Sequence, residues 1–258
     1  MLIISDTLIY NNPNFINGLY FLMEFFYIKK ENKMKNKLNT ALAALFLATT
    51  SMATIATEMD DTYFAARVGS SNLNLDNLNF TNPRVTGVIT TEDDKERARV
   101  ASVAFGKSVN IEGNPARVEI EYSDYSSETF ESTWAPFANW QRVTVESKSL
   151  MVNTLFDTKV EGGTIFAGIG LGFAKNKSSA EQQTSGSFDS NTETNFAYSL
   201  MAGGSTPISD GIELELMYKY ADLGDIETGW DTFNTPADEK WDGDLKSNQV
   251  SLGLVFKL

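Results

Sequence analysis

The stretch Gln249-Val250-Ser251-Leu252-Gly253-Leu254-Val255-Phe256-Lys257-Leu258 places a large apolar residue at every second position. Side chains alternate across a pleated strand, so these residues share one face, and mostly smaller or polar residues share the other. The same alternation recurs in Val118-Glu119-Ile120-Glu121-Tyr122 and in Ile212-Glu213-Leu214-Glu215-Leu216, with glutamates on the second face. The pattern predicts an all-β membrane barrel, with apolar side chains outside and carboxylates inside.

Eight segments with this character are separated by connectors of two kinds. The expected strands are 62–70, 98–105, 116–125, 142–155, 164–176, 192–205, 212–222 and 247–258. Long polar connectors (71–97, 126–141, 177–191, 223–246) alternate with shorter ones (106–115, 156–163, 206–211). This order is typical of an eight-stranded antiparallel up-and-down transmembrane barrel, with large external loops and short periplasmic turns. Both ends of the barrel domain are then expected on the periplasmic side.

The N-terminal region has the layout of a helical signal peptide over residues 34–57. A basic start at Met34 precedes the apolar run 40–48 and a small-residue zone, with cleavage expected between Ala53 and Thr57. Residues 1–33 precede this complete signal, so we expect an over-long N-terminal extension, the alternative being an additional anchor. Residues 58–258 form the barrel domain, expected in the bacterial outer membrane after signal cleavage.

The composition excludes several classes of function. The 258 residues include no His and no Cys, which removes disulfides, thiolate chemistry, imidazole metal ligation and a Ser-His-Asp triad. The formal net charge of −13 argues against nucleic acid as a partner, because a phosphate backbone requires a basic face. We therefore expect no cofactor, no metal site and no nucleic-acid partner.

Because successive side chains of a strand point to opposite faces, the alternation assigns each side chain to the lumen or to the lipid. Charged lumen residues should form ion pairs with trapped water, because an unpaired ion in a narrow lumen costs several kcal/mol. A structural network is favoured over a gated ion path, since eight strands enclose little more than their own side chains. The expected lumen network comprises Arg67, Arg117, Glu119, Glu121, Glu213, Glu215 and Lys219. The expected lipid-facing set comprises Ile120, Tyr122, Ile169, Leu171, Leu214, Leu216, Leu252, Leu254 and Phe256.

Gly168, Gly170 and Gly172 superficially resemble a nucleotide-binding fingerprint. A dinucleotide loop needs its glycines between a strand and a helix, whereas these three alternate with apolar residues inside an expected strand. They are therefore expected on the inner face, where missing side chains leave room for long side chains from neighbouring strands.

Four motifs resemble the eight-stranded outer-membrane barrels of the opacity-protein and OmpA-like porin families. They are Phe166 to Phe173, Met151 to Asp157, Phe196 to Gly203 and Met217 to Gly224. The family usually ends in an aromatic residue that the barrel-assembly machinery recognises. Here the last residue is Leu258, and Phe256 precedes it on the same face. The resemblance implies surface display, adhesion, membrane integrity or weak solute permeation, and it supplies no catalytic residues.

The sequence therefore predicts a non-enzymatic outer-membrane protein with a narrow polar lumen and a role in surface interaction, adhesion or envelope integrity. Alternatives are a small-solute porin and, less favoured, a soluble lipocalin-like carrier with apolar side chains inside. Expected partners are outer-membrane lipid, the assembly machinery during insertion, and an extracellular or host ligand bound by the loops. The loop 223–246 carries clustered carboxylates beside Trp230, Phe233 and Trp241, and is interpreted as a solvated acidic loop rather than a calcium site.

Overall fold

The part of the chain that the computed structural model describes is almost entirely β-strand. It comprises residues 62–81, 88–91, 94–135, 139–183, 186–234 and 236–258. The expected extension at 1–33 and the signal peptide at 34–57 lie outside these residues. Within them, no helix is long and apolar enough to cross a membrane.

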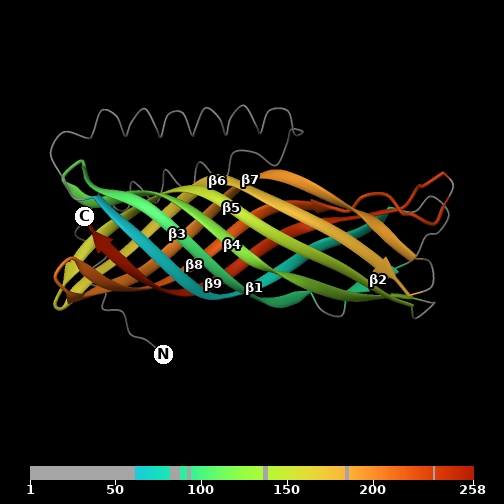
Figure 1. The fold of residues 1–258 in the computed structure, drawn as a ribbon, viewed down its shortest axis with the longest axis horizontal. Coiled ribbons are helices and arrows are strands. Elements are labelled where there is room, and N and C mark those ends of the chain that lie inside the picture. Colours follow the sequence, from blue (N-terminus) through green and yellow to red (C-terminus); the bar gives the residue numbers. More distant parts are fainter. Residues whose placement is uncertain (1–61, 82–87, 92–93, 136–138, 184–185, 235) are drawn as a thin grey trace. The chain divides into compact units, whose positions relative to one another are not determined.

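Eight long strands close into one antiparallel ring (Figure 1). They are β1 (Thr62–Thr81), β3 (Lys95–Ile111), β4 (Asn114–Ala135), β5 (Asn139–Val160), β6 (Gly163–Gln182), β7 (Gly186–Ser209), β8 (Ile212–Glu227) and β9 (Lys240–Lys257). Consecutive ring strands pair with each other, and β9 pairs with β1 to close the ring. The short β2 (Val88–Thr91) adds to the end of β4. The predicted eight-stranded up-and-down barrel is confirmed.

The connectors at one end of the barrel, here called the turn end, are shorter than predicted. In place of the connectors expected at 106–115, 156–163 and 206–211, two-residue turns join the strands at Glu112-Gly113, Glu161-Gly162 and Asp210-Gly211. Each glycine has a positive φ, between 72° and 85°, which glycine adopts without strain. Asp210-Gly211 is a known hairpin signal, and the two Glu-Gly pairs also place glycine at the second turn position. The strands therefore extend closer to each turn than the alternation of apolar residues predicts.

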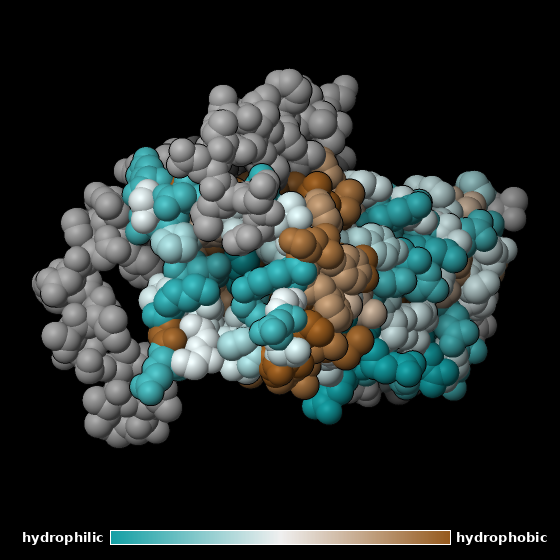
Figure 2. Space-filling view, turned by 60° about the vertical axis from the view of Figure 1, so that its left-hand side comes forward, coloured by the Kyte–Doolittle hydropathy of each residue, from teal (hydrophilic) through white to brown (hydrophobic). Residues whose placement is uncertain are grey.

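An apolar belt surrounds the barrel near the turn end. Figure 2 shows hydrophobic surface as a band with hydrophilic surface on both sides. On β6 the outward apolar residues run from Ile165 to Phe173, close to the roughly 9–11 residues that a tilted strand needs to cross a bilayer. This exterior contradicts the soluble-carrier alternative. Large apolar residues exposed on the belt include Phe64, Val68, Val103, Phe105, Ile120, Tyr122, Leu150, Phe156, Ile165, Leu200, Leu214, Leu216, Tyr218, Val250, Leu252 and Leu254.

Beyond the belt, the ring strands continue toward the opposite end, here called the loop end. The ring strands are 16 to 24 residues long, so much of the polar sequence expected in loops is paired strand. There the interior is apolar and the exterior is polar. A core fills the lumen, and its members include Leu73, Leu75, Val100, Tyr125, Phe130, Val143, Val145, Phe188, Leu223, Ile226, Trp241 and Leu245. The long connectors are shorter than predicted: residues 126–135, 139–141, 177–182 and 186–191 are strand, and the connector expected at 223–246 is reduced to 228–239. Their outward side chains are polar because the exterior beyond the belt meets water instead of lipid.

Aromatic residues of the last expected loop occupy different environments. Trp241 is fully buried inside the loop-end core, where Phe80 stacks on it with ring centroids 4.6 Å apart. Phe233 packs against the same core. Trp230 is 49% exposed, and Lys240 Nζ lies 5.2 Å from its ring centroid. Of this group, only Trp230 is substantially exposed.

Candidate functional site in the barrel lumen

A cluster of charged side chains fills the lumen inside the apolar belt. Arg67 of β1, Glu119 and Glu121 of β4, and Glu215 of β8 alternate with belt residues and therefore face inward. Each is at most 2% exposed. Removing such ions from water costs several kcal/mol each unless they are paired and hydrogen-bonded. The ion pairs among them therefore determine whether the lumen is stable and closed.

Arg67 is the centre of the cluster. Its Nε donates to Glu215 Oε1 at 2.7 Å, and its Nη2 donates to Glu119 Oε2 at 2.9 Å. Its Nη1 donates to Glu121 Oε2, also at 2.9 Å. The planar guanidinium fork satisfies three carboxylates on two strands at once, an arrangement that the single ammonium of lysine does not reproduce.

Other donors complete the shell of the glutamates. Glu119 accepts hydrogen bonds from the Tyr63 hydroxyl at 2.9 Å and from Asn153 Nδ2 at 3.0 Å. Lys219 Nζ forms an ion pair with Glu121 Oε1. Both carboxylates are thus held by a cation and by at least one further donor, which leaves them little freedom to move aside for a solute.

Arg117 extends the network toward the turn end. Its Nε donates to Asp157 Oδ2 at 3.0 Å and its Nη1 donates to Glu215 Oε2 at 3.2 Å. Its guanidinium carbon lies 4.7 Å from the ring centroid of Phe166. Because Glu215 also accepts from Arg67, this carboxylate joins the two arginines into one network.

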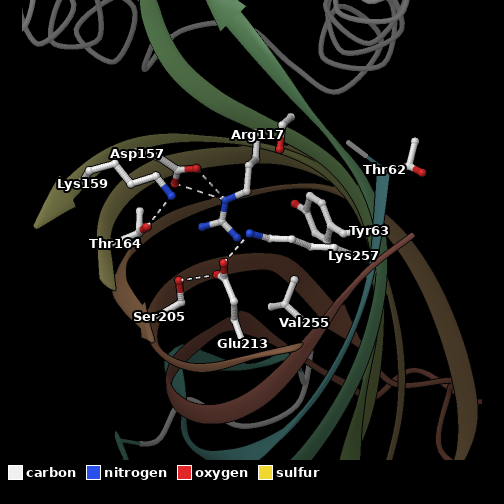
Figure 3. Close-up of a pocket in the computed structure, with 11 residues that line it drawn as sticks. Thr62, Tyr63, Arg117, Asp157, Lys159, Thr164, Ser205, Glu213, Val255 and Lys257 are labelled. Carbon is white, nitrogen blue, oxygen red and sulfur yellow. Dashed lines mark hydrogen bonds and ion pairs between the residues drawn. The ribbon is translucent and has the colours of Figure 1, made fainter. Parts of the chain in front are cut away.

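A small pocket opens where the lumen reaches the turn end (Figure 3). Glu213 lies here, paired with Lys257 Nζ at 2.6 Å and with the Ser205 hydroxyl at 2.8 Å. Lys159 Nζ donates to Thr164 Oγ1 at 3.0 Å. The pocket has a volume of about 60 Å³, which accommodates water-sized molecules. It is a shallow vestibule to the closed network.

The structure brings six of the seven sequence-predicted lumen residues into one connected network and places Glu213 apart from it. The six are Arg67, Arg117, Glu119, Glu121, Glu215 and Lys219. Sequence reasoning missed Tyr63, Asn153 and Asp157, which contact them. The available signal was parity, because Asp157 shares the inner face of β5 with Asn153. The expected strand ended at residue 155, which excluded Asp157, whereas Tyr63 and Asn153 lie inside expected strands but are uncharged, and the expected network comprised charged residues only.

The three glycines of β6 lie in the middle of a strand, as predicted, and not between a strand and a helix. A Cβ at Gly170 would overlap Asn153 Oδ1 and Ser199 Oγ. Small residues on this inner face therefore give space to polar side chains of β5 and β7.

The predicted lipid-facing residues lie on the outer face of their strands. Leu252, Leu216 and Ile120 are about half exposed, at 54%, 53% and 49%. Ile169, Leu171 and Phe256 are partly buried among neighbours, and Phe256 lies 6.5 Å from the Phe64 ring. Tyr122, Leu214 and Leu254 are also exposed.

Residues 228–239, here called the loop-end cap, connect β8 to β9, and the structure describes 228–234 and 236–239. Asp231 accepts hydrogen bonds from the backbone N–H groups of Asn234, Asp238 and Glu239 at 2.7 to 2.8 Å. Burial acts to raise the pKa of Asp231, but these three donors outweigh it and hold the pKa below its ordinary value. Among the described residues, no group of three or more carboxylates is arranged to hold a metal ion.

Residues 40–257 match the family model described as the outer membrane protein beta-barrel domain. The fold is also similar to solved structures at low sequence identity. Neisserial surface protein A is 13% identical, with 76% of this chain and 97% of that chain covered and a TM-score of 0.43. OprG from Pseudomonas aeruginosa is 10% identical, with 76% and 95% covered and a TM-score of 0.45. The outer membrane protease OmpT from Escherichia coli is 8% identical, with 80% and 100% covered and a TM-score of 0.49. No curated protein sequence matches the chain.

Proposed function

The chain belongs to the family of outer membrane protein β-barrel domains, and from this premise we propose a closed, non-enzymatic barrel that acts in surface interaction at its loop end. Its location is the bacterial outer membrane. The observation that carries the proposal is the double filling of the lumen. Charged residues occupy the section inside the belt, and an apolar core occupies the section beyond it. A permeating solute would have to displace both, which favours surface interaction over a small-solute porin.

The absence of enzymatic activity is part of the proposal. The sequence has no His and no Cys, which removes the commonest general acid–base residue and the thiolate nucleophile. The lumen glutamates Glu119, Glu121 and Glu215 each form an ion pair with Arg67, so none of the three is an unpaired carboxylate.

The loop end supports a role in binding because it is a paired extension of the barrel. Strand pairing continues to Trp134 opposite Asn139 and to Gln182 opposite Gly186. A preordered platform loses less conformational entropy on binding than flexible loops would. We therefore infer that a partner would meet a rigid rim, including the exposed Trp230 of the loop-end cap.

The closed lumen predicts an absence of ion conduction. Purified protein reconstituted in planar bilayers at neutral pH should give no stable conductance steps, because the Arg67 network and the loop-end core block the path. A general porin reconstituted in parallel verifies that channels would be detected. Reproducible steps from the unmodified chain would contradict the closed-barrel proposal.

Surface interaction predicts that the loop-end cap is needed for binding but not for assembly. Replacing residues 228–239 by a two-residue Asn-Gly turn should abolish adherence of expressing cells to a target surface. The variant should keep heat-modifiable migration in detergent gels, since the ring strands remain. As a matched control, an Asn-Gly replacement of the turn-end pair Glu161-Gly162 should leave adherence unchanged. Unchanged adherence in the cap variant, together with detergent sensitivity of cells lacking the whole protein, would favour an envelope role instead.

A further inference from the structure

Cationic residues at the loop-end border of the apolar belt gather on one side of the barrel. On each ring strand, the border position is the first outward polar residue on the loop-end side of the belt. Small outward residues such as Ala101 are counted as part of the belt. The eight border residues are Ser70, Arg99, Asp124, Lys148, Lys175, Thr194, Asp222 and Asn248. All three cations lie on the four consecutive strands β3 to β6, and none lies on β7, β8, β9 or β1. One outward position beyond the border, Lys246 of β9 is already paired with Asp76 at 2.6 Å.

These cations are poorly neutralised by the protein itself. Lys148 and Lys175 are direct cross-strand partners, and like charges in that position repel. Asp124 lies 3.6 Å from Lys148, but both side chains are about half exposed, at 48% and 51%, so their attraction is weak. Lys175 and Arg99 have no ion pair with any residue in the described ranges. Glu146 lies one outward position farther from the belt, opposite Lys177.

Arg99 has a second cation beside it and uncharged partners on the β1 side. Arg97 is two residues farther along β3, on the same outward face, and is also exposed. Their partners across the β1 ladder are Ser70 and Asn72, which carry no charge. Four exposed cations thus lie on the same wall as Asp124, in a chain whose formal net charge is −13.

The apolar residues next to this patch define the depth at which it lies. Leu150 is the outward residue next to Lys148 on β5 and is 53% exposed. Phe173 is the outward residue next to Lys175 on β6, and it packs edge-on against Phe196 with ring centroids 6.5 Å apart. Acyl chains contact the belt, so the groups at the height of the patch are lipid headgroups.

We propose that Arg97, Arg99, Lys148 and Lys175 form a binding site for phosphate groups of outer-leaflet lipid. Phosphate oxygens between adjacent Lys and Arg side chains would relieve the repulsion between Lys148 and Lys175 and form charge-assisted hydrogen bonds. The chain as a whole is negatively charged and is therefore not expected to adsorb to anionic lipid through its surface in general. The four cations on this wall would attract lipid phosphate groups to this side of the barrel only. The lipid would then bind to β3–β6 in preference to β7–β9.

The test compares lipid binding by the full barrel and a variant with Arg99→Gln, Lys148→Gln and Lys175→Gln. The control variant, Arg142→Gln, Lys107→Gln and Lys240→Gln, loses the same charge away from the border. The probe is diphosphorylated lipid A in neutral detergent micelles, and dephosphorylated lipid A is the matched ligand. At about 1 kcal/mol for each cation near a lipid surface, the border variant should bind diphosphorylated lipid A about a hundredfold more weakly than the control variant. Heat-modifiable migration verifies that both variants are folded.

Equal affinity of the border and control variants would overturn the proposal, as would equal binding of the phosphorylated and dephosphorylated lipids. Inorganic phosphate is tested alone to separate the lipid from the free ion. Failure of free phosphate to compete with lipid A at equal concentration supports a lipid site. Saturable phosphate binding as tight as that of lipid A would show that the acyl chains are not recognised, and would overturn the lipid assignment.

Discussion

Replacing Arg67 with methionine should lower the free energy of unfolding by about 3–5 kcal/mol, the loss typical of breaking a buried ion pair. The guanidinium contacts Glu119, Glu121 and Glu215 within 2.9 Å. Methionine keeps much of the side-chain length but leaves these buried carboxylates with fewer cations. Urea unfolding of the barrel in lipid vesicles, followed by tryptophan fluorescence, measures the change.

Arg142→Met is the matched control for that prediction. Arg142 pairs with Glu131 at 3.0 Å, but the two side chains are 38% and 41% exposed. An exposed pair contributes about 1 kcal/mol or less, so this variant should be nearly as stable as the parent. Adding Glu119→Gln to Arg67→Met should recover part of the loss, because it removes one orphaned charge. Similar effects of the two methionine variants would mean that water screens the lumen network.

Gly172→Val should prevent assembly of the barrel, and Gly172→Ala should lower its stability by about 1–3 kcal/mol. A Cβ at Gly172 would overlap the carbonyl oxygen of Leu150 and come within 2.7 Å of Met151 Cα. Both atoms belong to the backbone of β5, so a rotamer change cannot relieve the overlap. The shift from folded to unfolded mobility in detergent gels measures assembly, and urea unfolding measures stability.

The control for Gly172 is Gly204→Ala on the neighbouring strand β7. A Cβ at Gly204 would lie 3.3 Å from the carbonyl oxygen of Thr164, which a small adjustment accommodates. Normal assembly is therefore expected for this variant. A Gly172→Val protein that assembled as well as Gly204→Ala would show that β5 and β6 are not held as closely as the structure has them.

The positions of the ring strands could be predicted from sequence because each strand carries its own alternation of apolar and polar residues. The strand lengths could not. Leu73, Leu75, Val143 and Val145 are apolar but face the lumen, beyond the belt. Apolar residues mark the outer face only where lipid surrounds the barrel. Beyond that height water surrounds the barrel, so the outward residues are polar and the inward residues are apolar. From sequence alone, such polar outward residues resemble loops.

The alternation of side chains along each strand is a local property of the extended chain, so the sequence by itself determined which charged residues face away from lipid. They are Arg67, Glu119, Glu121 and Glu215. Which of them meet was decided by the tertiary structure. Arg67 is 52 residues from Glu119 and 148 from Glu215, and only the closure and stagger of the ring set their heights in the lumen. By contrast, Arg99, Lys148 and Lys175 lie on one wall because β3 to β6 are consecutive strands that pair in sequence order, and the register of those pairs sets their common height.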